Sequence, residues 1–199
     1  MNIDKLYVFT DGSCCKKLLI SNNKSINYTN TKQIPIGAIG IYFYTIDSNI
    51  NTIFENHSKI IDNDGQKITN QTMELLACIQ ALQIIKEKVD NNSIKVNVVY
   101  IYTDSLYVIN SVLKWINIWK NNGWKTTKGK DVENKELIEI LYTLKNSTIL
   151  TIFKHVKAHQ KEPIDKNAFE YKIWYGNYMA DKLAKNASLK YIEHNINIL

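Results

Sequence analysis

The most regular pattern in the sequence is a helical one over residues 71–89. Apolar residues recur there at three- and four-residue spacings, namely Leu75, Leu76, Cys78, Ile79, Leu82 and Ile85. Because they cover a wide arc of the helix, the segment is predicted to be largely buried. Whatever fold the chain adopts must therefore supply apolar layers around this helix.

Five β-prone runs, rich in β-branched and aromatic residues, surround this helix. They cover 6–10, 36–46, 50–61, 96–102 and 149–153. Three of them precede the helix as a meander, whereas the last two are separated by helical segments over 106–120 and 134–145. A final helix is predicted over about 176–191. This order predicts an α/β fold with a five-stranded mixed sheet, in which three antiparallel strands are followed by strands reached through helical crossovers.

Length and polarity constrain the organisation of the chain. Its 199 residues suit one domain with a substantial core, and neither a repeat nor a linker is visible in them. We therefore expect residues 1–199 to form a single domain. Polar stretches over 14–35, 121–131 and 157–174 are predicted as loops. A loop as long as the first of these is usually functional or mobile inside a compact domain.

The charge balance favours a polyanionic partner. All 25 basic residues are Lys, against 19 acidic residues, which gives a formal net charge of +6. Three Cys residues without a framework spacing indicate reduced thiols in an intracellular protein. The first residues lack the apolar core of a signal peptide, and no apolar run approaches the length of a membrane span, so no membrane partner is expected.

Four carboxylates stand where such a fold can gather them. Asp11 follows the first strand, Glu74 lies in the first turns of the buried helix, Asp104 ends the fourth strand, and Asp181 lies early in the last helix. Parallel pairing of the first and fourth strands places Asp11 beside Asp104. Crowded carboxylates repel one another unless a cation is present, and Mg²⁺ prefers such oxygen ligands. Two such ions activate a water and stabilise the leaving oxygen of a phosphodiester.

Each of the four carboxylates also has a simpler interpretation. Asp11 starts a sequence typical of turns, and Glu74 lies where a negative charge favours the helix dipole. Asp104 stands at the position of an ordinary helix cap, and Asp181 in an amphipathic helix is by default a solvated charge. Spacing alone therefore leaves open whether these residues bind a metal or only stabilise local structure.

Between Asp104 and Asp131 the sequence has no acidic residue. The stretch combines aromatic and basic side chains, namely Trp115, Trp119, Trp124, Lys114, Lys120, Lys125, Lys128 and Lys130. Lys neutralises phosphates and Trp packs on sugars and bases, so the segment is predicted to bind nucleic acid. The alternative is a helix whose Trp side chains face the core and whose Lys side chains face water. We expect some of the Trp residues to be structural, Trp115 above all.

Local sequence motifs narrow these alternatives. The segments that carry them are Tyr7–Cys14, Thr69–Leu75, Tyr102–Val108, His155–His159 and Gly176–Ala184. In this order they resemble the motifs of type 1 ribonuclease H, and together they cover nearly the whole chain. Residues 115–126 are similar to the basic protrusion of cellular members of that family, an element that retroviral members often lack.

The resemblance implies an RNase H-like fold and endonucleolytic hydrolysis of the RNA strand of RNA/DNA hybrids. Two Mg²⁺ ions, for which Mn²⁺ is a substitute, support the reaction in the family, and the expected products have 5′-phosphate and 3′-hydroxyl ends. Asp11, Glu74, Asp104 and Asp181 match the metal-binding carboxylates. His159 matches a loop histidine that assists proton movement or product release, a role that suits an imidazole titrating at about 6.5. We expect a monomer whose partner is the hybrid.

Other positions match residues that contact the hybrid in relatives. Lys67, Thr69 and Asn134 match a pocket for one phosphate of the DNA strand, with Lys67 standing where relatives often carry Arg. The remaining matches are Gly12, Ser13, Cys14, Asn70, Gln71, Tyr107, Trp119, Lys120, Trp124, Lys125 and Thr126.

Two groups among these matches have distinct expected roles. Cys14, Asn70 and Gln71 match residues that face the RNA minor groove, where the 2′-hydroxyl distinguishes RNA from DNA. Tyr107 and Trp119 match aromatic positions that line the channel for the DNA strand. Recognition of the 2′-hydroxyl on one strand and of the phosphate pocket on the other is expected to select the hybrid without reading its sequence.

Two stretches depart from the family pattern and are expected as insertions, near 15–35 and 160–175. The first contains four Lys and no acidic residue, so it extends the nucleic-acid surface or is a mobile insertion. The second shields the site or packs on the last helix. Because the first motif begins near residue 7, no separate hybrid-binding domain is expected.

Three rival functions remain to be distinguished. A hybrid-binding module without catalysis is disfavoured by the presence of all four carboxylates. A zinc-binding interaction domain built from Cys14, Cys15, His155 and His159 is disfavoured because adjacent Cys do not fit the usual gap between zinc ligands. Another nuclease of the same fold, acting on DNA, shares the carboxylates but not the Trp-rich protrusion.

Overall fold

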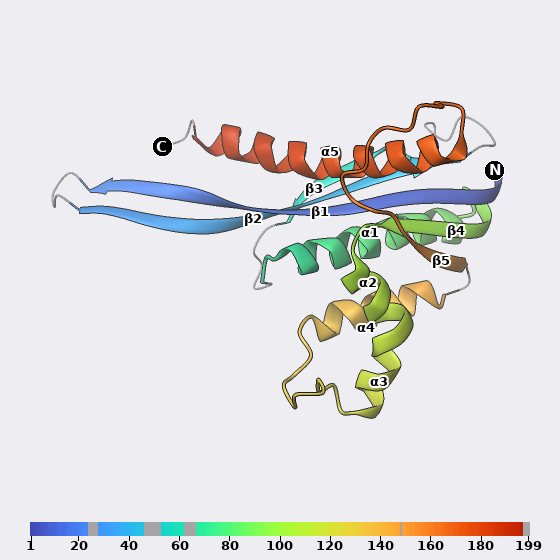
Figure 1. Cartoon of the computed structure of the whole chain (residues 1–199), viewed down its shortest axis with the longest axis horizontal. Helices are drawn as coiled ribbons and strands as arrows, with labels where there is room; N and C mark the ends of the chain where they lie inside the picture. Colours follow the sequence, from blue (N-terminus) through green and yellow to red (C-terminus); the bar gives the residue numbers. More distant parts are fainter. Residues whose placement is uncertain (24–27, 46–52, 62–66, 148, 197–199) are drawn as a thin grey trace.

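The computed structural model describes residues 1–23, 28–45, 53–61, 67–147 and 149–196, and it contains a five-stranded sheet (Figure 1). In sheet order the strands are β3 (His57–Ile61), β2 (Tyr28–Tyr44), β1 (Asn2–Asn23), β4 (Lys95–Thr103) and β5 (Leu150–His155). The β1–β2 and β2–β3 pairs are antiparallel, whereas the β1–β4 and β4–β5 pairs are parallel. The predicted α/β fold with a mixed sheet is confirmed.

The helices follow the predicted order. They are α1 (Asn70–Asp90), α2 (Leu106–Asn110), the π-helical turn η2 (Ser111–Trp115), α3 (Ile116–Asn121), α4 (Lys135–Lys145) and α5 (Phe169–Ile196). The long helix α1 begins at a capping box, in which the Thr69 hydroxyl accepts a hydrogen bond from the Thr72 backbone N–H at 3.1 Å. The single helix predicted over 106–120 is divided into α2, η2 and α3.

The helices cover both faces of the sheet. In Figure 1, α5 lies along one face, while α1 lies on the other with α4 packed against it. The side chains of β1 alternate accordingly. Leu6 and Val8 join the main apolar core together with α1, whereas Tyr7 and Phe9 face Ala180 of α5. The sheet therefore separates two cores, and α1 is largely buried as predicted.

A glycine allows α5 to come close to the sheet. A Cβ atom at Gly40 of β2 would lie 2.1 Å from the carbonyl oxygen of Ala180, a distance that real Cβ atoms do not reach. Any side chain at this position would push α5 away from β2. The close approach matters for function because α5 carries Asp181, one residue after that contact.

The structure corrects the prediction of a loop over 14–35. β1 and β2 stay paired along this stretch, so most of it is an antiparallel hairpin. Among the residues that the structure describes, β4 pairs with β1 as far as Phe9 and β3 pairs with β2 from Gly37 onward. Residues 16–23 and 28–35, here called the arm, therefore extend beyond the rest of the sheet (Figure 1). The sequence of the arm has no apolar alternation, which is the signal from which strands are predicted.

The structure also corrects the start of the last helix. α5 begins at Phe169, so the predicted loop over 157–174 is helical in its last part. Aromatic side chains explain the extra turns. The ring of Phe169 meets that of Tyr7 at 5.4 Å between centroids, and the ring of Tyr175 meets that of Tyr42 at 5.8 Å, both in edge-to-face geometry. These contacts attach the first turns of α5 to the sheet, although Phe169 itself stays 43% exposed. The polar neighbours in the sequence gave no sign of them.

Three smaller outcomes concern the start of β3, the loop over 121–131 and the apolar character of the helices. β3 begins at His57 rather than at residue 50, and residues 50–52 of the predicted strand lie outside the described residues. The loop predicted over 121–131 is confirmed as a series of turns with one bridge between Lys125 and Asp131. No helix within the described ranges combines the length and apolar character that crossing a bilayer requires.

Candidate active site

Three carboxylates meet at the end of the parallel strand pair. The β1–β4 pairing runs to Phe9↔Tyr102. Asp11, which is still within β1, and Asp104, which follows β4, therefore both lie just beyond the paired part of the two strands. Glu74 reaches this point from the second turn of α1. One oxygen from each of the three carboxylates, here called the carboxylate cluster, lies within 4.8 Å of the other two. The predicted proximity of Asp11, Glu74 and Asp104 is confirmed.

Gly12 brings the strand and the helix together at this point. A Cβ atom on Gly12 would lie 2.4 Å from the backbone nitrogen of Glu74, so only glycine lets β1 touch the start of α1 here. The backbone N–H of Gly12 also lowers the pKa values of Asp11 and Glu74, against the larger effects of burial. The Asp-Gly pair is thus a packing requirement of the cluster as well as a turn signal.

The carboxylate cluster is crowded enough to oppose its own ionisation. Burial, followed by the negative charges of Asp104 and Asp181, raises the pKa of Asp11 to about 7. Burial and then the charge of Asp11 raise the pKa of Glu74 well above its ordinary value. The pKa of Asp104 is raised in the same way, by burial first and then by Asp181. A cation between these oxygens would remove that repulsion.

The donor set of the cluster fits a divalent cation. Glu74 is buried, with 8% of its surface exposed, and its Oε2 atom has no hydrogen-bond partner. A buried carboxylate oxygen without a hydrogen-bond partner destabilises the folded protein. A metal ion bound between the three carboxylates would give it a partner. All three donors are hard oxygens, which suits a hard divalent cation better than a softer metal.

The zinc alternative is not supported by this arrangement. Within the described ranges, the group of His, Cys, Asp and Glu side chains that could hold a metal consists of the carboxylate cluster alone. Cys14 instead donates a long hydrogen bond from Sγ to the carbonyl oxygen of Ile68, at 3.9 Å. Cys14 and Cys15 are half-buried free thiols.

Asp181 lies beside the cluster without joining it. Its Oδ2 accepts a hydrogen bond from Lys185 Nζ at 2.8 Å, an i,i+4 ion pair on α5. Its charge nevertheless raises the pKa values of Asp11 and Asp104, so it is close enough to act on them. Lys185, which the sequence reasoning did not single out, is the partner that holds Asp181 in place. The acidic residue four positions earlier on a helix was its only sequence signal.

Two histidines approach Asp104 from the end of β5 and the loop that follows. His155 Nε2 lies 3.2 Å from the backbone carbonyl oxygen of Asp104, within hydrogen-bond distance. His159 is exposed in the loop, with a left-handed φ of 52°. Both lower the pKa of Asp104 against the larger effect of burial. The sequence favoured His159 over His155. In the structure, the Thr103↔His155 pairing places His155 next to the end of β4, and the loop that follows β5 brings His159 to the same site.

A cleft of about 730 Å³ opens in front of the cluster. One wall is formed by β1 and α1, including the predicted residues Gly12, Ser13, Cys14 and Asn70. The other wall is formed by the β5–α5 loop with His159 and by the first half of α5. Its α5 wall carries aromatic side chains from the expected 160–175 insertion, namely Phe169 and Trp174, and continues to Tyr178. The second part of this segment thus forms the start of the last helix, and its side chains line the cleft.

The basic and aromatic segment forms a second surface away from the cluster. The rings of Tyr107, Trp115, Trp119 and Trp124 follow one another with centroid distances between 5.5 and 6.4 Å. Trp119 and Trp124 are partly buried against the main core, whereas Trp115 is 36% exposed. The expectation that Trp115 is the most structural of the three is therefore wrong. Ring size and spacing could not show which Trp the π-helical turn would rotate outward.

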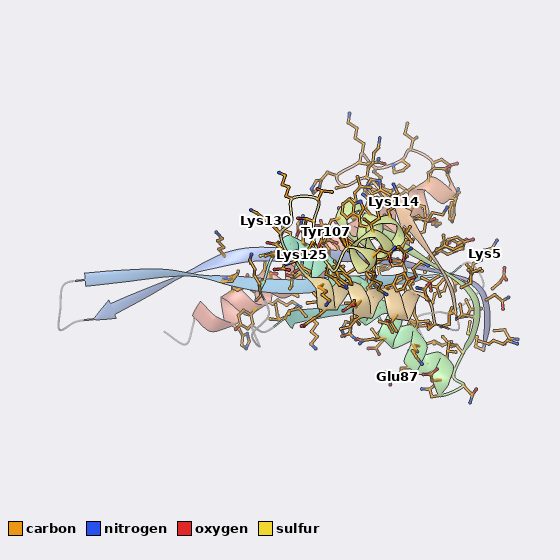
Figure 2. All side chains as sticks on the ribbon, turned by 90° about the horizontal axis from the view of Figure 1, so that it is seen from below. Lys5, Glu87, Tyr107, Lys114, Lys125 and Lys130 are labelled. Atoms are coloured by element: carbon orange, nitrogen blue, oxygen red, sulfur yellow. The ribbon has the colours of Figure 1, made fainter. Side chains whose placement is uncertain are left out.

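A second cavity of about 480 Å³ connects this segment with α1. It is lined by Gln71, Tyr107, Trp119, Thr126, Lys128 and Lys130, among others. Figure 2 shows Lys125 and Lys130 on the same side of the molecule as Tyr107. Thr126 accepts a hydrogen bond from the backbone N–H of Lys130 at 3.2 Å, and Lys125 pairs with Asp131 at 2.5 Å. The segment is a folded loop with specific contacts.

Other predicted contact residues have partners of their own. Asn134 has a left-handed φ of 59° and donates from Nδ2 to the hydroxyl of Tyr107 at 3.1 Å. Lys67 is exposed and Lys120 lies over the ring of Tyr142, 4.4 Å from its centroid. Thr69 caps α1. Among the described residues, no hydrogen bond joins Asn134 to Lys67 or Thr69.

Comparison with known proteins gives a consistent result. The family model described as RNase H matches residues 4–189. A curated protein named Ribonuclease H from Clostridium botulinum is 32% identical over 184 residues, which cover 92% of this chain and 95% of that protein. The solved structure of LC9-RNase H1, a type 1 RNase H with the type 2 active-site motif, aligns with a TM-score of 0.59 at 18% identity, over 94% of this chain and 72% of that one.

A second solved structure is a complex. LC11-RNase H1 bound to an RNA/DNA hybrid aligns with a TM-score of 0.54 at 16% identity, over 94% of this chain and 99% of that chain. At identities of 18% and 16%, the two solved structures support the fold alone. The match of the family model over most of the chain and the nearly full-length curated relative speak for the family.

Proposed function

The chain belongs to the ribonuclease H family, whose members hydrolyse the RNA strand of RNA/DNA hybrids, and we propose that the carboxylate cluster is where this chain does so. The observation that carries the proposal is the meeting of Asp11, Glu74 and Asp104 within 4.8 Å at the head of a cleft. The unpartnered Glu74 Oε2 atom and the raised pKa values support a centre built for cations.

Dependence on a divalent metal is a property of the family, and the acidic cluster agrees with it. We propose two Mg²⁺ ions, with Mn²⁺ as a substitute, held by Asp11, Glu74, Asp104 and Asp181. When bound, such ions activate a water and stabilise the leaving oxygen of the phosphodiester. The ion pair from Lys185 keeps the Asp181 carboxylate at the rim of the cluster in the meantime.

The histidines supply the groups that move protons. His159 lies on the cleft wall with its side chain exposed, where its imidazole can reach substrate and solvent. We propose that it helps a proton to reach the leaving 3′ oxygen, which gives 3′-hydroxyl and 5′-phosphate ends, or helps the product to depart. His155 is a positioning residue in this proposal, because its ring nitrogen bonds the backbone of Asp104 and thereby fixes the end of β4.

The walls of the cleft and the second cavity suit the two strands of a hybrid. Cys14 and Asn70 line the cleft, and Gln71, the next residue of α1, lines the second cavity. We propose that these three side chains face the RNA minor groove, where the 2′-hydroxyl is displayed. Tyr107 and Trp119 line the second cavity, where aromatic packing and nearby Lys side chains suit the sugar-phosphate backbone of DNA.

The remaining predicted contacts extend the grip on the DNA strand. We propose Lys67, Thr69 and Asn134 as a pocket for one DNA phosphate. We also propose residues 115–126 as the basic protrusion, in which Lys120, Trp124, Lys125 and Thr126 contact the DNA strand. The resemblance of these positions to the family supports the assignment. The hydrogen bond from Asn134 to Tyr107 also supports it, because it connects the phosphate pocket with the rings of Tyr107 and Trp119. We also propose that residues 1–199 act as one catalytic domain, as an intracellular monomer.

The decisive experiment is a cleavage assay on an end-labelled RNA/DNA hybrid. Matched RNA/RNA, DNA/DNA and single strands are run beside it, with Mg²⁺, with Mn²⁺ or with a chelator. Cutting of only the RNA strand of the hybrid, dependent on the metal and leaving 5′-phosphate ends, is expected. Tight hybrid binding without any cutting would favour a binding module instead, and cutting of DNA-only duplexes would show that the substrate is wrong.

A further inference from the structure

One face of α5 lines the cleft beyond the carboxylates. The cleft is lined by five α5 residues at helical spacing, namely Trp174, Asn177, Tyr178, Asp181 and Lys185. Asp181 and its partner Lys185 belong to the acidic centre. The two aromatic rings share the same helix face but take no part in that centre, so their presence on the cleft wall needs another explanation.

The two rings form a rigid pair. Trp174 and Tyr178 are stacked, with ring centroids 5.5 Å apart and planes 7° from parallel. The indole Nε1–H of Trp174 donates to the carbonyl oxygen of Gln160 at 2.9 Å, which fixes the ring against the β5–α5 loop. Tyr171 contacts Trp174 and Tyr175 contacts Tyr178, at centroid distances of 5.6 and 6.4 Å. The pair is thus held in place before any ligand arrives, which lowers the entropic cost of binding one.

Packing of α5 on the sheet does not account for this pair. Tyr175 turns toward the sheet, where it meets Tyr42, and Phe169 meets Tyr7. Tyr178, by contrast, is 44% exposed on the cleft wall. Lys182 Nζ lies 5.7 Å from the centre of its ring, so a positive charge accompanies the aromatic surface. A ring beside a cation is the combination that packs on the sugars and phosphates of nucleic acid.

Helix geometry places the pair relative to the point of cleavage. Tyr178 and Trp174 precede Asp181 by three and seven residues, which corresponds to about 4.5 and 10.5 Å along the helix axis. A nucleic-acid strand advances by about 3.4 Å per residue along its duplex. A strand that follows the α5 face therefore meets the rings one to three nucleotides from the phosphate at the carboxylates. The bases there are paired and stacked, which leaves the sugar as the accessible surface.

We propose that Trp174 and Tyr178 form an aromatic subsite that packs on the sugar of an RNA-strand nucleotide one to three residues from the cut phosphate. The subsite sets how much strand the enzyme needs on that side of the cut. This inference rests on the proposed function of the carboxylate cluster, and it adds a specificity element that the acidic residues do not provide.

The test uses hybrids with one cut site whose RNA strand ends at zero to five nucleotides on either side of it. The variants are Tyr178→Ala, Trp174→Ala and Trp174→Phe, and the control is Leu189→Ala, an exposed apolar residue of α5 that does not line the cleft. On long strands the two Ala variants of the subsite should raise KM by about five- to twentyfold, with kcat within about twofold of wild type. Trp174→Phe keeps a ring and should change KM much less.

Strand length separates a contact from a structural role. The KM effect of Tyr178→Ala should vanish when the strand stops short of the contacted nucleotide, and it should do so on one side of the cut only. An unchanged KM, or an equal loss on all strand lengths, would overturn the subsite.

Failure of the proposed function is distinguishable from failure of the subsite. A wild-type protein that cuts no hybrid refutes the proposed function. In that case the same hybrids are titrated in binding experiments with chelator, and the affinity decides the subsite alone. A Kd raised about five- to twentyfold by Tyr178→Ala, with Leu189→Ala unchanged, supports it, whereas equal Kd values overturn it.

Discussion

The cleft and the arm begin on the same strand, yet they are held in different ways. Residues 11–14 of β1 are enclosed by α1 on one side and by α5 and its preceding loop on the other, and they stand next to the end of β4. From Lys16 onward β1 pairs with β2, beyond the reach of β4 and β3. The cleft can therefore hold like charges close together, whereas the arm mainly extends the surface of the protein.

This difference predicts how changes in each region act. Changes at the carboxylates of the cleft should alter the rate of the chemical step and the response to pH, because these groups act on one another at short range. Changes on the outer surfaces should alter affinity and its dependence on salt, because exposed Lys side chains act on phosphates through screened electrostatics. A variant that mixes the two effects would contradict the comparison.

The largest effect is expected from Asp104→Asn. The amide keeps the shape of the side chain but removes a charge from the cluster, so kcat should fall by about a thousandfold or more while the Kd for the hybrid changes little. Single-turnover cleavage and fluorescence titration measure the two quantities separately. The matched control is Asp4→Asn, an exposed β1 carboxylate that accepts from Asn97 and lies outside the cleft. Retained turnover would refute the role of the cluster.

A second large effect concerns stability without metal. The pKa of Asp11 is raised from 3.8 to about 7 in the folded protein. Between these values the folded state binds more protons than the unfolded state, so stability falls as the pH rises through this window. Asp11→Asn removes the charge and should raise the melting temperature in chelator at pH 8 by several degrees, at about 2–4 °C per kcal/mol, with little gain at pH 4.

Thermal unfolding of both proteins across this pH range checks that expectation. Added Mg²⁺ should stabilise the wild-type protein at pH 8 and should stabilise the Asn variant less, because the variant offers one charge fewer. An equal shift in melting temperature at pH 4 and pH 8, or destabilisation by Asp11→Asn at pH 8, would show that the cluster is not electrostatically strained.

The Lys side chains of the second cavity, which follow the protrusion in the sequence, should show the opposite behaviour. Lys128 and Lys130 line the second cavity, so replacing both by Ala should weaken hybrid binding about tenfold at moderate salt. The slope of log K against log salt should become shallower by about 0.7–0.9 for each phosphate that the protein no longer neutralises. The control is Lys86→Ala, whose side chain pairs with Asp90 on α1. A changed kcat with an unchanged salt slope would place these residues in the chemistry instead.

How much of this could be predicted from the sequence depends on what each residue contacts. Asp11, Glu74 and Asp104 were predictable because strand order and helix periodicity fix where each of them lies. The helix over 71–89 was predictable because its apolar positions serve one large core. Features that local periodicity encodes were therefore found, together with the fold.

The features that were missed depend on contacts between distant segments. The arm carries no apolar alternation, since its strands pair only with one another beyond the sheet. The first turns of α5 form because Phe169 and Tyr175 find aromatic partners on β1 and β2, which no spacing within the helix reveals. The place of His155 follows from the register of β5 on β4, and the exposure of Trp115 follows from a π-helical turn.

The smallest effect is expected from shortening the arm. Joining Lys16 to Pro35, which face each other in the β1–β2 register, through an Asn-Gly turn keeps the strands that build the cleft. The change removes Lys17, Lys24 and Lys32, and no acidic residue lies between Gly12 and Ile46 to offset them. Affinity for long hybrids should fall about two- to fivefold at low salt and less at high salt, because screening weakens the contribution of the arm.

The length of the hybrid gives the control for that prediction. On hybrids just long enough to fill the cleft, kcat and KM of the shortened protein should equal those of wild type, because β1 up to Cys15 keeps its partners. A loss of kcat on the short hybrids would mean that the hairpin beyond the sheet braces the strand that carries Asp11. The arm would then contribute to catalysis by positioning Asp11. The distinction between a cleft that determines kcat and an arm that determines affinity would be wrong.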